Sequence, residues 1–476
     1  MRAQGQRAPG RARRRLPRLA LLILFLVWAA LAFWHSHKPL PPGTHLDAAA
    51  CAVPPEAVSF IADVSSADAY GRPVLSQAIF DELLTAVHAA RRFIVLDYAR
   101  FAAAPAQAAP QRRLSGELVA ALLEQRRLMP QLAVLVLLDP ANELGAAPLE
   151  LLRASGVAVV PVELGGLRDA NLLSGPLWRL GLRAWPGGGA AVAQRLRLTA
   201  DHRKLLIADD GREGLVGIIG SAEPADAESA WSNLALRVRG PVLASLLEAE
   251  LTLAQRSGWR GPVAPFVPPA DAECAEGTPT VQVLTEGAIG VALRRALEAA
   301  APGEAIDLAS YALAERGVIE ALLAAARRGV HVRLILDPQE DARSAAPGGL
   351  PNQPVASALV ARSGGAIQVR WYRTHGEHFH GSLALVYGAS RLWLALGSAN
   401  FTRRGLDDYN LEADVALRLT RAEPLAQQAL GYFDALWGNR AGLGIEYTAD
   451  YAAYADPSQA DYWVGRLLEG AGVTPF

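Results

Sequence analysis

The sequence is poor in cysteine and has no excess of charge of either sign. Its 476 residues include two cysteines, Cys51 and Cys274, and two isolated cysteines exclude the cysteine-rich patterns that bind structural zinc. The 46 basic and 47 acidic residues give a net charge of −1. Nucleic-acid-binding proteins usually carry a basic excess, so the composition argues against nucleic acid as a partner.

Lysine is almost absent. Of the 46 basic residues, only Lys38 and Lys204 are lysines, and the other 44 are arginines. Lys204 stands two residues after His202. An ammonium is a compact point charge that a planar guanidinium does not replace, so we interpret Lys204 as kept for its chemistry. A surface lysine beside a structural histidine is the alternative.

The N-terminus reads as a membrane anchor. Seven arginines lie in residues 1–18, and residues 19–34 (LALLILFLVWAALAFW) contain no charge. A spanning helix needs about 20 residues, and flanking residues can extend this run. We predict a basic cytoplasmic tail at 1–18 and a transmembrane anchor at 19–36, with the rest of the chain exported. A cleaved signal peptide is the alternative, because residues 30–32 (ALA) resemble a cleavage site.

Export would place both cysteines where disulfides persist. Cys51 and Cys274 each lie just upstream of one of the two halves described below. A disulfide between them is possible in an exported protein, and two free thiols are the alternative.

Strand-like and helix-like segments alternate from about Val58 onward. The segments 93–97 and 132–138 are apolar and short, as in buried strands, and segments 79–92 and 114–127 show helical spacing of apolar residues. This alternation predicts an α/β fold with a mostly parallel sheet flanked by helices.

The same order of segments recurs in the second part of the chain. From Gly220 to Asn233 is 13 positions, and from Gly397 to Asn410 is also 13. Internal duplication fixes architecture, so we predict two repeated α/β halves around a pseudo-twofold axis. The expected divisions are a spacer at 37–56, half 1 at 57–260, a linker at 261–280, half 2 at 281–440 and a C-terminal tail packed on half 2 at 441–476.

One motif in half 1 has the residues needed for phosphate chemistry. His202, Lys204 and Asp209 form H-x-K-x-x-x-x-D at the start of a predicted hairpin, and Gly220-Ser221 follows it. His202 and Lys204 would share one strand face because side chains alternate with a period of two. An imidazole can attack phosphorus while an adjacent ammonium holds its oxygens.

The second motif keeps only its histidine. The stretch THGEHFHGS holds three histidines, and the apolar run that follows it aligns His380 with His202. Ser382 then occupies the lysine position, and Tyr387 occupies the aspartate position. A metal site of three histidines and Glu377 is the alternative, but half 1 has no such set.

The duplicated motif resembles the phospholipase D superfamily, in a membrane-anchored bacterial branch. The intact first motif and the segment GSANFT (397–402) carry the resemblance, which spans nearly the whole exported region. It implies phosphodiester cleavage or phosphatidyl transfer without a metal or cofactor, at one site where the halves meet. It also implies a single-pass protein of the bacterial inner membrane with its catalytic region in the periplasm.

The resemblance assigns roles to individual residues. The candidate catalytic residues are His202, His380, Lys204 and Asp209. His202 would be the nucleophile and His380 the general acid, although the sequence alone leaves their order open. The groups expected to hold the phosphate oxygens are Lys204, Ser221, Ser398 and Asn400. Glu412 would orient a histidine, whereas Ala235 fills the equivalent place in half 1.

We therefore expect a membrane-anchored phosphodiesterase or phosphatidyltransferase that acts on phospholipid head groups. A single chain supplies both histidines, so a monomer suffices. Because half 2 lacks the lysine, a pseudoenzyme that binds anionic lipid stays open as an alternative, and so does a nuclease of the same superfamily.

Overall fold

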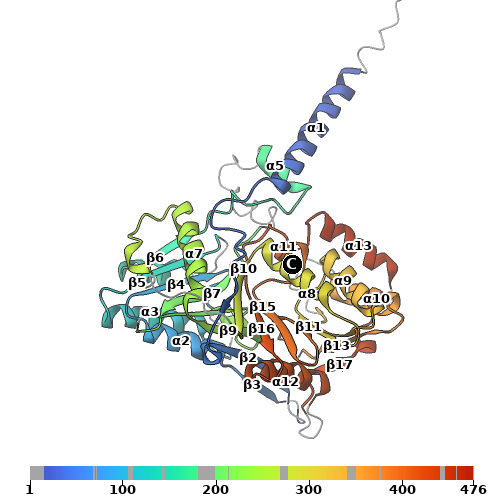
Figure 1. The fold of residues 1–476 in the computed structure, drawn as a ribbon. Helices are drawn as coiled ribbons and strands as arrows, with labels where there is room; N and C mark the ends of the chain where they lie inside the picture. The colour runs from blue at the N-terminus through green and yellow to red at the C-terminus, as the bar shows by residue number, and fades with distance from the viewer. Residues whose placement is uncertain are drawn as a thin grey trace, which may run out of the picture.

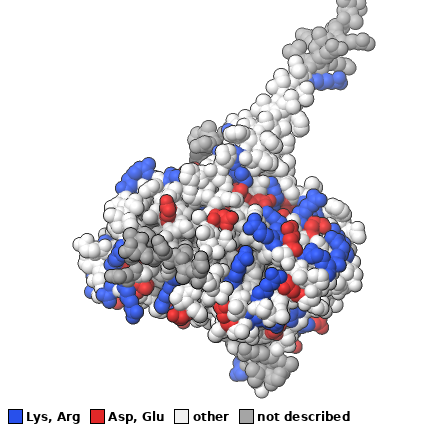
Figure 2. Space-filling view, viewed as in Figure 1, with Lys and Arg blue, Asp and Glu red and all other residues white. Residues whose placement is uncertain are grey.

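The computed structural model describes residues 15–67, 70, 72–104, 111–140, 145–180, 199–212, 214–267, 277–339, 350–374, 377–439, 445–456 and 458–474. Helix α1 (Arg15–His37) stands out from a two-lobed body, with the first half of the chain in one lobe and the second half in the other (Figure 1). Over Arg18–His37, α1 is long and apolar enough to cross a membrane. Figure 2 shows it as a rod that is uncharged over most of its length.

The first lobe is built on an eight-stranded sheet, counted over the described residues. The strand order is β3-β2-β9-β8-β7-β4-β5-β6. Its strands are β2 (Val58–Ala67), β3 (Pro73–Ser76), β4 (Phe93–Tyr98), β5 (Ala133–Leu138), β6 (Ala158–Pro161), β7 (Lys204–Asp209), β8 (Leu215–Gly220) and β9 (Asn233–Arg239).

The second lobe is built on a nine-stranded sheet over the same described ranges. Its order is β1-β10-β16-β15-β14-β11-β12-β13-β17. The strands are β1 (Cys51–Ala52), β10 (Thr280–Thr285), β11 (Ala305–Ser310), β12 (His331–Leu336), β13 (Ile367–Tyr372), β14 (Ser382–Tyr387), β15 (Arg391–Gly397), β16 (Ala413–Thr420) and β17 (Thr448–Asp450).

The two sheets share one topology. The order β2-β9-β8-β7-β4-β5-β6 in the first sheet corresponds strand for strand to β10-β16-β15-β14-β11-β12-β13 in the second. The predicted α/β class with two similar halves is therefore confirmed.

The sheets are mixed, so the expectation of mostly parallel sheets needs correction. Strands β4, β5 and β6 run parallel, as do β11, β12 and β13, while the other described pairings are antiparallel. Helical crossovers return the chain in the same direction and give parallel pairs. The hairpins that follow each histidine return it in the opposite direction and give antiparallel pairs.

Helices cover the outer face of each sheet, and one core joins the inner faces. The helices of the first lobe are α2 (Ile79–Ala89), α3 (Leu114–Leu128), α4 (Ala146–Ala154) and α7 (Ala244–Arg256), and α5 (Ser174–Leu180) packs beside α1. Those of the second are α8 (Gly287–Ala299), α9 (Arg316–Arg327), α10 (Asn352–Arg362), α11 (Arg403–Leu406), α12 (Pro424–Gly438) and α13 (Gln459–Gly470). The shared core contains inner-face residues of both sheets together with α7 and α12.

Strand alternation decides which core each side chain enters. In β7, Leu205 and Ile207 enter the shared core, whereas Leu206 and Ala208 pack against the outer helices of the first lobe. Successive side chains of a strand point to opposite faces. A strand that is apolar at every position can therefore join two layers, as these central strands do.

Cys51 lies in β1, at the edge of the second sheet, and is buried and disulfide-bonded. Cys274 lies outside the described residues, so the pairing of the two cysteines stays a prediction.

Candidate active site

The two predicted histidines lie at the junction of the lobes, and each is held by the opposite half. The backbone N–H of His202 donates to Leu411 O at 2.9 Å, and that of His380 donates to Ser232 O at 2.8 Å. Short parallel bridges continue both contacts. Each half therefore accepts a backbone hydrogen bond from the histidine of the other half, as a pseudo-twofold axis requires.

Buried aspartates support the alignment of His380 with His202. The residue before His202 donates its backbone N–H to Asp139 Oδ2 at 2.8 Å, and the residue before His380 donates to Asp337 Oδ2 at 2.9 Å. Both aspartates follow corresponding strands, β5 and β12. His380 is thus the spatial counterpart of His202, as the strand pattern predicted.

His202 has a carboxylate partner from the other half. Its Nδ1 lies 2.9 Å from Glu412 Oε2, and the imidazole remains 21% exposed while Glu412 is buried. Ser398 Oγ donates to Glu412 Oε2 at 2.6 Å, and Asn410 Nδ2 donates to Oε1 at 3.2 Å. These bonds fix the carboxylate, which in turn fixes the ring of His202.

His380 has neutral partners. Its Nδ1 lies 3.1 Å from Ser221 O and 3.3 Å from Asn233 Oδ1. Both atoms are acceptors, so Nδ1 carries the proton and Nε2 is left for chemistry. The rings of Trp231 and Tyr311 pack against the imidazole, with centroids 5.0 and 5.2 Å away. Sequence reasoning missed Asn233, Trp231 and Tyr311.

Asn233 is the counterpart of Glu412. The residue after Asn233 donates its backbone N–H to Ser221 Oγ at 3.1 Å, and the residue after Glu412 donates to Ser398 Oγ at 3.0 Å. The equal spacing of 13 residues had instead paired Asn233 with Asn410 and set Glu412 against an alanine. The connection in half 2 is two residues longer, which is why spacing alone gave the wrong register.

Both serines follow a glycine that has no room for a side chain. A Cβ on Gly220 would collide with Leu234 O, and one on Gly397 would collide with Ala413 O. The close approach of β8 to β9, and of β15 to β16, explains why Gly-Ser occurs at both places. Asn400 is also buried at this end of β15.

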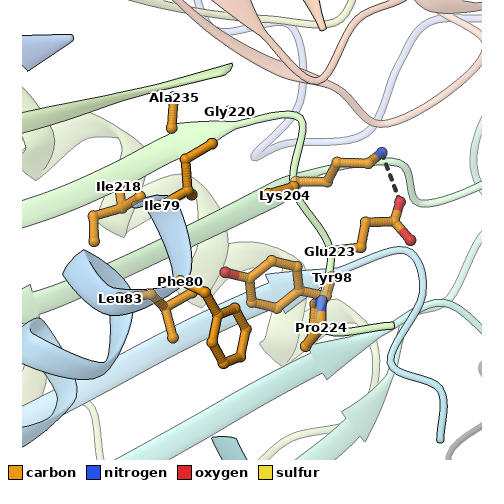
Figure 3. Close-up of a pocket in the computed structure, with 11 residues that line it drawn as sticks. Ile79, Phe80, Leu83, Tyr98, Lys204, Ile218, Gly220, Glu223, Pro224 and Ala235 are labelled. Carbon is orange, nitrogen blue, oxygen red and sulfur yellow. Dashed lines mark ion pairs between the residues drawn. The ribbon is translucent and has the colours of Figure 1, made fainter. Parts of the chain in front are cut away.

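Lys204 begins β7, and Glu223 neutralises it. The Lys204 ammonium lies 2.9 Å from Glu223 Oε1 and 3.0 Å from His202 O, and the lysine side chain is fully buried. Figure 3 shows the ion pair beside Tyr98, at the edge of a small apolar pocket. Glu223 is the residue that Asn400 replaces in half 2, and its pairing with the lysine was not foreseen from the sequence.

Asp209 lies at the opposite end of β7 from Lys204, about 16 Å away at 3.3 Å per residue. Its Oδ1 accepts backbone N–H groups from Arg92 at 2.8 Å and Phe93 at 2.9 Å. The carboxylate therefore fixes the start of β4. We remove Asp209 from the candidate catalytic residues, because its place in the motif reflects a structural role.

In half 2, the lysine and the aspartate of the motif are replaced by Ser382 and Tyr387, and only the second replacement keeps its structural role. Ser382 is buried at the start of β14, where Lys204 stands in half 1. Tyr387 ends that strand, and its hydroxyl donates to Asp307 Oδ2 at 2.9 Å. Tyr387 thus keeps a structural hydrogen bond, whereas Ser382 replaces an ammonium with a neutral hydroxyl.

Burial governs the protonation of the site. Desolvation and the nearby Lys204 ammonium lower the pKa of His202 to about 3. Desolvation, Lys204 and His202 likewise hold the pKa of His380 well below its usual value. Desolvation raises the pKa of Glu412 to about 8. Both imidazoles are thus neutral at pH 7, and a nearby anion is needed to favour a proton on either.

Within the described ranges, no group of three or more His, Cys, Asp and Glu side chains is placed to hold a metal ion. Of the alternative histidine-rich set, His375 lies outside those ranges. His378 Nδ1 lies 3.5 Å from Asp337 Oδ2, so this second histidine packs behind the site against the buried aspartate.

Comparison with known proteins agrees with this architecture. Residues 293–437 match the sequence model of a family described as cardiolipin synthase, PLD-like domain. No curated protein matches the chain. Phosphatidylserine synthase from Haemophilus influenzae Rd KW20 is 12% identical, with a TM-score of 0.53 over 92% of this chain and 96% of its own.

Two other solved structures match at lower scores. Polyphosphate kinase from Porphyromonas gingivalis is 13% identical, over 87% of this chain and 53% of its own, with a TM-score of 0.48. The phospholipase D family member Nuc from Salmonella typhimurium is 23% identical, over 37% of this chain and 99% of its own, with a TM-score of 0.29. The chain is therefore similar in sequence to the cardiolipin synthase, PLD-like domain family over residues 293–437, and similar in fold to phosphatidylserine synthase along nearly its whole length.

Proposed function

We propose that the protein is a membrane-anchored phosphodiesterase or phosphatidyltransferase that acts on phospholipid head groups through a phosphohistidine. The observation that carries this proposal is the pair of histidines at the lobe junction, each held by the opposite half and each with a different partner. The family model that matches residues 293–437 is described as cardiolipin synthase, and the structure that covers 92% of this chain is a phosphatidylserine synthase, which favours transfer to an alcohol over transfer to water.

The unlike partners assign the two roles. When Nε2 of an imidazole becomes bonded to phosphorus, the ring becomes cationic, and a carboxylate at Nδ1 stabilises that charge. His202 has this carboxylate in Glu412 at 2.9 Å. His380 has an amide and a carbonyl instead, and neutral partners leave its imidazolium more acidic. A more acidic group is the better proton donor to an alkoxide.

The reaction then proceeds in two displacements. In the first, His202 Nε2 forms a bond to phosphorus, the bond to the leaving oxygen breaks, and His380 Nε2–H gives its proton to that oxygen. In the second, an alcohol or water gives its proton to His380 as its oxygen bonds to phosphorus, and the N–P bond breaks. Lys204 stabilises the charge on the non-bridging oxygens.

The negative charge of the substrate favours the protonated form of His380, which is the form that acts as the general acid. Both histidines have lowered pKa values. A bound phosphodiester brings a negative charge close to them, and an opposite charge within a few ångströms raises the pKa of an imidazole. Substrate binding is therefore expected to be accompanied by proton uptake, which protonates His380 when the proton is needed.

The experiment is turnover by the full-length chain in mixed micelles with a chelator present, using phosphatidylglycerol and a chromogenic phosphodiester. The parent should turn over both substrates, and His202→Ala should turn over neither. A chelator that abolishes the activity would contradict the metal-free mechanism. No turnover by a folded parent, with phosphate-dependent thermal stabilisation retained, would favour the second candidate.

That second candidate is a lipid-binding protein without turnover. One observation favours it: Ser382 stands where a second lysine would hold the phosphate, and Glu223 neutralises the lysine that is present. Loss of a single oxyanion donor costs about a hundredfold or more in rate. The site would then bind anionic phosphodiesters and release them unchanged.

A further inference from the structure

The part of helix α1 that stands free of the body is too short to cross a bilayer by itself. Residues 18–37 are apolar enough to span, and 20 residues at 1.5 Å each match a hydrocarbon core of about 30 Å. Only residues 18–27 are exposed throughout, and from Trp28 onward most of the helix is partly covered by the body. Ten residues reach about 15 Å, half of the hydrocarbon thickness.

The element that covers the second half of α1 is α5. The Trp28 indole donates to Leu173 O at 3.3 Å, just before α5 begins. Trp28 lies nine residues before His37, which is about 13 Å along the helix axis. When residues 18–37 lie in the bilayer, the start of α5 therefore lies well below the membrane surface. Figure 1 shows α5 alongside the lower part of α1, above the two lobes.

The side chains of α5 divide into an apolar exposed face and an inward face. Leu173, Leu177 and Leu180 are 54%, 54% and 50% exposed, and their spacing of four and three residues places them on one side of the helix. Trp178 is buried on the other side. The only charged residue of α5, Arg179, also turns inward, donating to Asp169 Oδ1 at 2.9 Å.

The segment before α5 is bound firmly to the end of α1. The Asp169 backbone N–H donates to His35 O at 2.9 Å, and Lys38 Nζ donates to Gly165 O at 3.1 Å. Together with the Trp28 bond, these contacts join the segment that leads into α5 to α1 and to the residue after it. The two helices therefore pack side by side.

We propose that α5 is a second membrane-inserted element, with Leu173, Leu177 and Leu180 in contact with the acyl chains of the leaflet that holds the second half of α1. This rests on the proposed membrane anchor. The catalytic body would then be seated on the bilayer in a fixed orientation. Because His202 is bound to the second lobe through Leu411 O, an orientation of the body fixed in this way also sets the depth of the site relative to the lipid head groups.

The test is a depth measurement on the full-length chain in phosphatidylglycerol-containing nanodiscs. A spin label is attached at Leu177→Cys or, as the matched control, at Leu151→Cys, because Leu151 is 57% exposed on α4. Unsubstituted protein treated with the same label gives the background from Cys51 and Cys274. Oxygen, which concentrates in the acyl region, and a water-soluble nickel chelate are the two collision partners.

The Leu177→Cys label should collide with oxygen and lose most of its collisions with the nickel chelate, whereas the Leu151→Cys label should keep them. Equal access of the chelate to both labels would overturn the proposal. Protease protection of the N-terminal tail in sealed proteoliposomes of the same lipid, with the catalytic body on the outside, reports whether α1 spans. A protected tail with an aqueous Leu177→Cys label contradicts the α5 proposal alone, and an unprotected tail contradicts the anchor as well.

Discussion

The two halves of the molecule share a strand order but differ at the site. In half 1, His202 is accompanied by Lys204, and β9 begins at Asn233. In half 2, His380 is accompanied by Ser382, and the position before β16 is Glu412. Since each half supplies the partner of the other half's histidine, the carboxylate of half 2 serves the complete motif of half 1. The difference shows how a symmetric fold can support two unlike histidines.

The same comparison separates catalytic from structural features. Asp209 and Tyr387 occupy one position and both make hydrogen bonds that hold strands. Lys204 and Ser382 occupy another and have no common function. Within the motif, the aspartate can therefore be replaced by a tyrosine that keeps the structural role, whereas replacing the lysine by a serine removes the ammonium. Substitutions that make one histidine environment more like the other, or that remove one of its charged groups, test this separation.

The largest effect among the partner residues is expected from Glu412→Gln. The amide cannot stabilise a cationic phosphohistidine, so kcat/KM should fall by about a hundredfold or more. In the parent, the raised pKa of Glu412, about 8, predicts that kcat/KM increases with pH up to that value, because only the ionised carboxylate accepts Nδ1–H. This rising limb should be missing in Glu412→Gln. A pH profile of both proteins measures it, and an unchanged limb would assign that ionisation to another group.

A smaller effect is expected from Asn233→Asp, which gives His380 a carboxylate like that of His202. A nearby negative charge raises the pKa of an imidazole by about 1 unit or more. The donor becomes less acidic, so kcat for a lipid substrate should fall by up to about tenfold. The ¹³C chemical shift of the His380 ring, assigned by its loss in His380→Ala, follows the pKa. A pKa that does not move would contradict the hydrogen bond to Asn233.

Glu223→Gln should change binding more than rate. The ammonium of Lys204 would lose its ionised partner, and breaking a buried ion pair destabilises a fold by about 3 kcal/mol. The freed charge should bind anions more tightly, by about tenfold for inorganic phosphate. Thermal unfolding at a series of phosphate concentrations gives both quantities. Lower stability without tighter phosphate binding would mean that Lys204 does not face the phosphate.

The smallest effect on catalysis is expected from Asp209→Asn. Its carboxylate caps backbone N–H groups at the start of β4, and a weakened buried acceptor costs about 1–3 kcal/mol of stability. At a temperature where the variant is folded, kcat and KM should match the parent. Denaturant unfolding together with steady-state kinetics makes the comparison. A large loss of kcat in a fully folded variant would return Asp209 to the site.

Much of this site can be predicted from the sequence because local patterns of apolar residues determine where its strands and histidines lie. The α/β alternation, the repeat, and the match of His380 to His202 follow from apolar periodicity in neighbouring strands. The match of Asn233 to Glu412 does not follow from such periodicity. The connection in half 2 is two residues longer, which preserves the strands but shifts the alignment of the residues after it. The Lys204–Glu223 pair was hidden for a related reason: it joins the first residue of β7 to the segment after β8, and only the folded sheet brings the two together.

The central claim is that His202 attacks phosphorus and His380 only moves protons, and leaving-group chemistry tests it most directly. A p-nitrophenyl diester has a leaving group that needs no proton, whereas a phospholipid releases an alkoxide. With the p-nitrophenyl substrate, His380→Ala should release a burst of about one equivalent and then stall, because the second step lacks its base. His202→Ala should give no burst, and neither variant should act on lipid. A burst from His202→Ala with none from His380→Ala would reverse the roles and contradict the account.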